Sequence, residues 1–249
     1  MTALLIVLLA GIAAGALNSV GGGGSFVAFP ALVAVGVAAV TANAATSVAL
    51  LPGGLASLWV YRRDLHPLPS TSIGVLTWTS VIGGALGAVL LLALPSESFD
   101  AVVPWLLAFA TFVLAFGRRI ARSLRTRVAG RPTIVAGQLL LSIYGGYFGG
   151  ASGLMMVAFW SVAASIDPGR ANPLRMAQMA AIYLTAGSIF LVASDVLTEW
   201  LKLVLMIVGA IVGGFGGATI ARRLSAPVLR AIVVTSAAAM TVGYFVVTS

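Results

Sequence analysis

The sequence contains no cysteine, one histidine and few charges. Of its 249 residues, 8% are charged and 60% are hydrophobic, whereas a soluble domain averages about 25% charged residues. Without cysteine there can be no disulfide, thiolate metal ligand or cysteine nucleophile, and the redox compartment stays undetermined. The mean hydropathy of +1.10 is typical of a polytopic α-helical membrane protein and excludes soluble folds.

Positive charge exceeds negative charge, with a formal net charge of +8. Binding to nucleic acid would require a basic face on a folded soluble domain, but here the charges lie between apolar runs. We therefore expect a lipid bilayer around the chain and no nucleic-acid partner.

The apolar runs have lengths suited to a membrane. A transmembrane helix needs about 17 to 25 residues. The runs lie at 3–19, 25–37, 41–61, 70–94, 101–117, 133–148, 153–166, 174–193, 200–221 and 226–247. Those at 25–37 and 153–166 are too short to span comfortably, and each follows a glycine cluster, at 21–24 or 149–153. We expect each cluster to join two partial or short helices into a re-entrant-like hairpin. Whether the hairpin dips into the membrane and returns or crosses it twice, its two ends lie on the same side.

Because both ends of each hairpin lie on one side of the membrane, the other six runs cross it in alternation. The charged residues between the runs then separate by side. All but one of the 14 basic residues fall on one side, while Lys202 falls on the other together with Glu97, Asp100, Asp195 and Glu199. The positive-inside rule makes the arginine side cytoplasmic. The sequence therefore predicts a multi-pass protein of the cytoplasmic membrane with both termini outside.

The chain also repeats itself. Gly83-Gly84-Ala85-Leu86-Gly87 recurs as Gly213-Gly214-Phe215-Gly216-Gly217, and Ala42-Asn43 recurs as Ala171-Asn172. We predict transmembrane repeats at 1–125 and 133–249, joined by a basic cytoplasmic linker at 126–132. Each half contains one hairpin, which returns to its own side, and three crossings, so the chain leaves each half on the side opposite to its entry. The second copy is therefore inverted relative to the first. The predicted fold is an all-α transmembrane bundle of two inverted repeats, the plan of secondary transporters that bind substrate near the midplane.

The glycine clusters are the predicted binding region. Consecutive glycines are poor helix formers, each costing about 1 kcal/mol relative to alanine, and a broken backbone at membrane depth must be covered by protein or line a cavity. The helix that follows each break would point its N–H groups and positive dipole end at the gap, which favours anions. The predicted substrate-binding residues are Asn18, Ser19, Gly22, Gly23, Gly24, Ser25, Asn43, Thr46, Ser47, Gly150, Ser152, Gly153, Arg175 and Gln178.

Arg175 leaves two interpretations open. Arg175 and Gln178 are three residues apart and share a helix face. Facing inward, Arg175 would be a fixed positive charge with a planar donor fork for a sulfonate, sulfite or carboxylate. Alternatively, Arg175 snorkels to the cytoplasmic headgroups from the first turn of its helix.

Three segments together resemble a known family. They are the first glycine break followed by Pro30, the stretch at 42–47, and Tyr144-Gly145-Gly146-Tyr147-Phe148-Gly149. They resemble the sulfite exporter TauE/SafE family over nearly the whole chain. The resemblance implies transport of small anions, often sulfur-containing ones such as sulfite or organosulfonates. The second break departs from the first by carrying Ala151 and Ser152, so we expect the two half-sites to bind asymmetrically.

Other functions fit less well. Gly150-Ala151-Ser152-Gly153 matches the nucleophile signature of rhomboid-type proteases, but a serine nucleophile needs a base, and the only histidine, His66, lies in a distant loop. We predict no enzyme, catalytic residue, metal or cofactor. A passive anion channel could share the breaks and dipole ends, although the inverted repeat favours a carrier with alternating access. The sequence leaves a homo-oligomer open.

Overall fold

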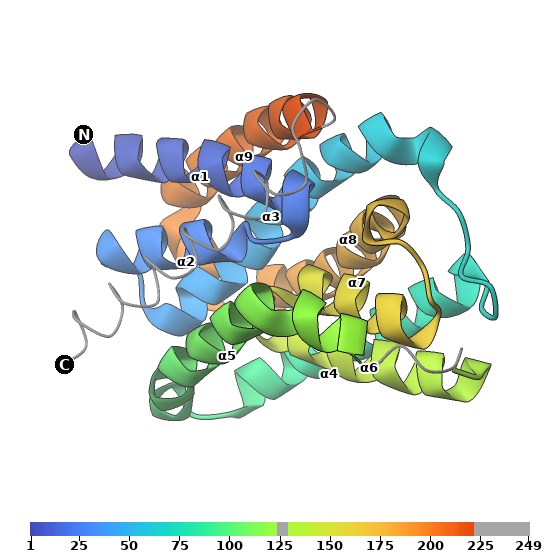
Figure 1. The fold of residues 1–249 in the computed structure, drawn as a ribbon. Helices are drawn as coiled ribbons and strands as arrows, with labels where there is room; N and C mark the ends of the chain where they lie inside the picture. The colour runs from blue at the N-terminus through green and yellow to red at the C-terminus, as the bar shows by residue number, and fades with distance from the viewer. Residues whose placement is uncertain (124–128, 222–249) are drawn as a thin grey trace.

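The computed structural model describes residues 1–123 and 129–221, and these residues form helices without a β-strand (Figure 1). The helices are α1 (Thr2–Gly21), α2 (Ser25–Ala34), α3 (Ala39–Tyr61), α4 (Ile73–Ala93), α5 (Ser96–Ser123), α6 (Arg131–Tyr147), α7 (Ser152–Ala163), α8 (Pro168–Ala193) and α9 (Trp200–Ala221), with short 3-10 helices η1 (Arg62–Asp64) and η2 (Asp195–Glu199). The predicted all-helical fold is confirmed. The run predicted at 226–247 lies outside the described residues.

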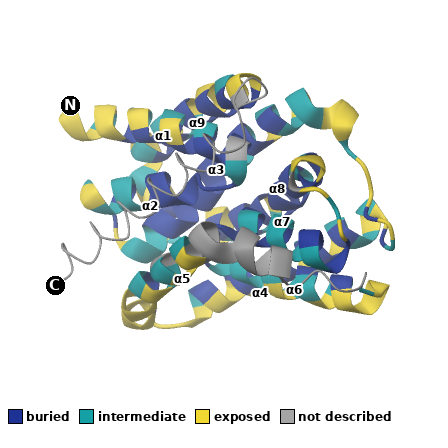
Figure 2. Cartoon of the chain, in the orientation of Figure 1, coloured by how far each residue is buried: buried dark blue, intermediate teal, exposed yellow. Residues whose placement is uncertain are grey.

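Five of the described helical segments are long and apolar enough to cross a membrane, and they correspond to α1, α3, α4, α8 and α9. Exposed residues lie on the outer faces of the bundle, while buried residues follow its interior (Figure 2), and many of the exposed residues are large and apolar. Trp78 is 70% exposed and Val192 is 90% exposed. Such outward apolar faces are suited to contact with lipid, so the chain is a multi-pass membrane protein.

Two helices begin at least five residues earlier than the apolar runs predicted. α8 begins at Pro168, because proline is favoured in the first turn and the Asp167 carboxylate accepts a hydrogen bond from the Gly169 N–H at 2.8 Å. α5 begins at Ser96 rather than near residue 101. Hydropathy missed both starts because polar and charged residues occupy these first turns. The earlier start of α8 places Arg175 two turns inside the helix.

The short helices form hairpins with the helices before them. α2 turns back toward the end of the molecule from which α1 enters (Figure 1). At the second hairpin, Ala129 N–H, just before α6, donates to Ala163 O at the end of α7 at 2.6 Å, so α7 returns to the start of α6. α6 starts at the opposite end of the molecule from α1 (Figure 1).

Glycines bring α1 against α9 and α4 against α6. A Cβ added at Gly83 would meet Leu139, Ser142 and Ile143, whereas one added at Gly209 would meet Leu8, Gly11 and Ile12. The two sets of neighbours have the same spacing along the chain, so the packing pairs Gly83 with Gly209. The sequence repeat instead pairs Gly83 with Gly213, one helical turn further along α9. Small residues permit this close approach of helices in membranes. The reciprocal packing supports two repeats, whose division at 126–132 stays a prediction.

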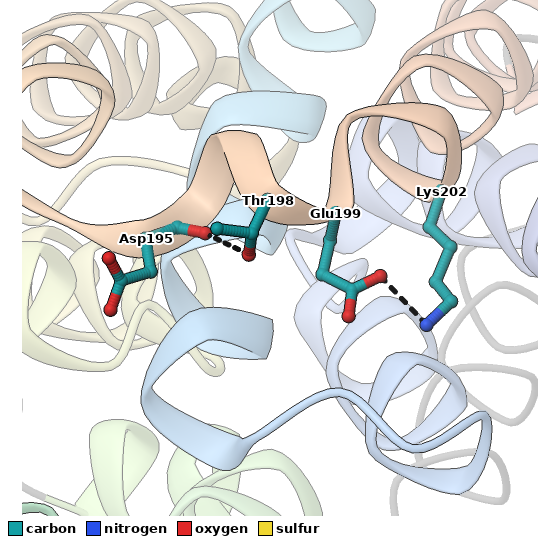
Figure 3. Close-up of polar contacts among 4 residues, drawn as sticks. All are labelled: Asp195, Thr198, Glu199 and Lys202. Carbon is teal, nitrogen blue, oxygen red and sulfur yellow. Dashed lines mark hydrogen bonds and ion pairs between the residues drawn. The ribbon is translucent and has the colours of Figure 1, made fainter.

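The connection between α8 and α9 contains an ion pair. Lys202 Nζ lies 2.8 Å from Glu199 Oε2, and Thr198 Oγ1 donates to the Asp195 carbonyl at 2.6 Å (Figure 3). Lys202 thus has an acidic neighbour on the side predicted to be opposite the arginines.

Candidate anion-binding site between two helix breaks

The first break lies between α1 and α2. Gly22 has a left-handed backbone, with φ of 81°, and its N–H donates to Asn18 O at 3.1 Å. This conformation favours glycine because other residues meet steric strain there. A Cβ at Gly24 would lie 2.8 Å from the Cβ of Asn18, so α2 can begin beside α1 only without a side chain at this position.

The second break lies between α6 and α7. Gly149 is left-handed, with φ of 77°, and Ala151 is left-handed with φ of 58°. A left-handed alanine is strained, and strain of this kind gathers at functional sites. Ser152 Oγ donates to Gly149 O at 2.9 Å, so this hydroxyl braces the break.

The two breaks lie against each other. A Cβ on Gly22 would be 3.4 Å from the Cα of Gly153, and a Cβ on Gly149 would be 3.6 Å from Ser25 Oγ. Each contact joins a residue of one break to a residue of the other. The N-termini of α2 and α7 therefore lie side by side.

Arg175 of α8 lies between the breaks and is 1% exposed. Its Nη2 donates to Asn18 O at 3.0 Å and to Ser19 O at 3.4 Å, and its Nε donates to Asn172 Oδ1 at 2.9 Å. Added Cβ atoms at Gly22 and Gly153 would lie 2.6 and 3.0 Å from its Nη1. The guanidinium thus faces inward, which excludes the snorkelling alternative.

Asn43 of α3 makes the corresponding contact at the second break. Its Nδ2 donates to Tyr147 O, in the last turn of α6, at 2.8 Å. Arg175 and Asn43 therefore close the carbonyl ends of α1 and α6, which leaves the N–H ends of α2 and α7. None of the described hydrogen bonds uses the backbone N–H of Ser25 or Gly153. Free N–H ends of helices attract negative charge.

Three of the other predicted polar residues bond within their own helices. Thr46 Oγ1 and Ser47 Oγ donate to the carbonyls of Ala42 and Asn43 on their own helix, at 2.8 and 3.2 Å. Ser19 Oγ donates to Ala16 O at 2.7 Å. Such local bonds are usual for hydroxyls in helices. Gly23 and Gly150 lie in the breaks themselves.

The structure does not bring Gln178 to the breaks. Its Oε1 instead accepts a hydrogen bond from Ser80 Oγ at 3.0 Å, and its Nε2 donates to Thr77 Oγ1 at 3.3 Å, both on α4. Sequence reasoning also missed Tyr183, which is buried on α8 with its ring against Gly149. A single tyrosine in an apolar run carries no signal of its position.

Comparison with known families decides the identity of the chain. The family described as sulfite exporter TauE/SafE matches residues 7–244. The chain belongs to this family. No curated protein matches it. Membership in TauE/SafE, a transporter family, supports a role in transport across a membrane rather than in catalysis, in agreement with the resemblance in the sequence.

Proposed function

We propose that this TauE/SafE protein is a carrier of small anions, with sulfite and organosulfonates as substrates, and that it binds them between the two breaks. The observation that carries the proposal is the charge of Arg175. No carboxylate among the described residues forms an ion pair with it. An uncompensated buried ion costs several kcal/mol, and a bound anion would offset that cost.

The donors around Arg175 suit an oxyanion. A guanidinium presents planar, paired N–H groups to the oxygens of a sulfonate or carboxylate. Arg175 Nη1 lies closest to Gly22 and Gly153, at the point where the N–H ends of α2 and α7 meet. The absence of side chains at these glycines lets a ligand approach the backbone closely.

Burial of the site favours a carrier over a channel. Arg175 and Asn43 are each 1% exposed, and Ser25 is 3% exposed. A solute would reach these residues only after one end of the molecule opens, as in alternating access between repeats. A channel would instead offer a continuous path.

Binding to Arg175 variants tests the site. Titration of the purified protein with methanesulfonate should show saturable binding, and Arg175→Gln should weaken it by about 30-fold or more, the effect of removing one partner of a buried charge pair. Arg170→Gln is the matched control, because Arg170 is exposed on the same helix. Wild-type affinity in a folded Arg175→Gln variant would place the site elsewhere.

Transport assays separate the two modes. In proteoliposomes, a carrier should take up labelled sulfite with saturation and accelerate exchange when unlabelled sulfite is inside. A current that rises in proportion to voltage and does not saturate with sulfite would identify a channel.

A further inference from the structure

A second group of polar side chains is buried away from the breaks, between α4, α6 and α8. We name Ser80, Gln138, Ser142 and Gln178 the polar cluster. Gln138 Nε2 donates to Ser80 Oγ at 2.8 Å, Ser80 Oγ donates to Gln178 Oε1 at 3.0 Å, and Ser142 Oγ lies 3.4 Å from Ser80 Oγ. Exposure is 0% for all four side chains. The polar cluster therefore joins three helices.

The polar cluster contains an unsatisfied acceptor. Gln138 Oε1 is buried and has no hydrogen-bond partner among the described residues. On α7, Met156 Sδ lies 3.8 Å from Gln138 Nε2. Trp160, one turn further along the same face of α7, has a buried Nε1 that also lacks a partner in the described part of the chain. Unpaired buried groups each cost about 1–3 kcal/mol.

Two residues of the polar cluster lie near the starts of their helices. Gln138 is two turns into α6 after Arg131, and Ser80 is two turns into α4 after Ile73. The start of α6 and the connection from α3 to α4, which carries Arg62 and Arg63, lie at the same end (Figure 1). α8 also starts near this end, and Gln178 follows Arg175 along it, so the polar cluster is not interposed between Arg175 and this end.

The other half has an apolar group at the corresponding place. Gly83 matches Gly209 in the packing, so Ser80, three residues earlier, corresponds to Met206. Ser142 matches Gly11 in the same way, so Gln138, four residues earlier, corresponds to Val7. The Asn43 and Asn172 match equates Gln178 with Ala49.

These counterparts are apolar and buried. Val7, Ala49 and Met206 are each 0% exposed, and a Cβ at Gly11 would lie 2.7 Å from Met206 O. The same helix packing is thus achieved without polar atoms, so packing alone does not require the polar cluster.

We propose that the polar cluster binds internal water, whereas its apolar counterpart in the other half is dry. Buried waters bind where several polar groups converge, and they satisfy groups such as Gln138 Oε1. This hydration does not depend on the proposed anion transport.

Hydroxyl-radical footprinting of the wild-type protein tests the hydration, since radicals form from water beside the side chain. Met156, in contact with the polar cluster, and Met206, in the apolar counterpart, are both 0% exposed, so they are a matched pair. Met156 should oxidise several-fold faster than Met206, with the exposed Met1 as the upper reference. Gln138→Leu should lower the Met156 rate to that of Met206. Equal rates in the wild-type protein would overturn the proposal.

The absence of native cysteine permits a second measurement. Ser80→Cys should react several-fold faster than Met206→Cys with a small hydrophilic thiol reagent, with exposed Ser98→Cys as the reference. Equal slow rates would contradict the hydration of the polar cluster. Neither measurement needs an anion. A protein that fails to bind methanesulfonate can therefore still show faster rates at the polar cluster than at its apolar counterpart, and a protein that binds methanesulfonate can still show equal rates.

Discussion

Gly22 and Gly36 share a left-handed backbone but have different surroundings. Their φ angles are 81° and 85°. A Cβ at Gly22 would lie 2.6 Å from Arg175 Nη1, whereas one at Gly36 would meet nothing within 4 Å. The pair therefore separates backbone strain from displacement of the guanidinium.

Gly36→Ala should destabilise the protein by about 1 kcal/mol through backbone strain alone. Gly22→Ala should cost more and should also weaken methanesulfonate binding, because the added methyl displaces Arg175. Thermal unfolding in detergent and titration with methanesulfonate measure the two effects. Equal destabilisation with unchanged binding in both variants would contradict the assigned position of Arg175.

Asn43 has a structural role at the second break. Asn43→Ala leaves the Tyr147 carbonyl without its side-chain donor, so we expect a loss of about 1–3 kcal/mol in the free energy of unfolding. Ser188→Ala is the control, because the exposed Ser188 hydroxyl bonds only to Leu184 O on its own helix. A loss no larger than that of the control would show that the bond to Tyr147 O is dispensable.

At the scale of helices, hydropathy predicted where most elements lie but not how α8 begins. Hydropathy missed the first turns of α8 because the stretch from Pro168 to Pro173 is polar, although Asp167 before Pro168 is a local signal for the start of a helix. A helix starting near residue 174 would put Arg175 at the membrane surface, and one starting at Pro168 puts it among buried residues. Six residues of helix decide between the two interpretations of Arg175.

The sequence could also locate the breaks but not the polar cluster. Consecutive glycines identify a break because of their own backbone preference. Gln138, in contrast, is informative only when its neighbours are known, and the packing of α4 against α6 depends on contacts between distant segments. The presence of glutamine in an apolar run was the one available signal.

The glycine contacts set the separation between helices. A Cβ at Gly213 would clash with the backbone of Ile12, its Cα at 2.9 Å, whereas one at Gly216 would meet nothing within 4 Å. Gly213→Ala should therefore destabilise by about 1–3 kcal/mol through overpacking. Gly216→Ala should be neutral or stabilise by up to about 1 kcal/mol through helix propensity. Thermal unfolding of the two variants checks this; a stable Gly213→Ala variant would show that α1 and α9 can separate freely.

For the whole molecule, the two ends are chemically distinct, and the positive-inside rule predicts that the arginine-bearing end faces the cytoplasm. In intact cells, Ser98→Cys should react with a membrane-impermeant thiol reagent, and His66→Cys should react only after permeabilisation. Both side chains are exposed, and the parent chain contributes no thiol of its own. The reverse pattern would invert the orientation.

The bond from Arg175 to the α1 carbonyls also bears on biogenesis. Asn18 and Arg175 are separated by 157 positions, so the ribosome must add most of the protein before the guanidinium joins the Gly22 N–H at the Asn18 carbonyl. Unpaired peptide groups are poorly tolerated in hydrocarbon. The amino-terminal half therefore completes its hydrogen bonding at the first break only after α8 has been translated.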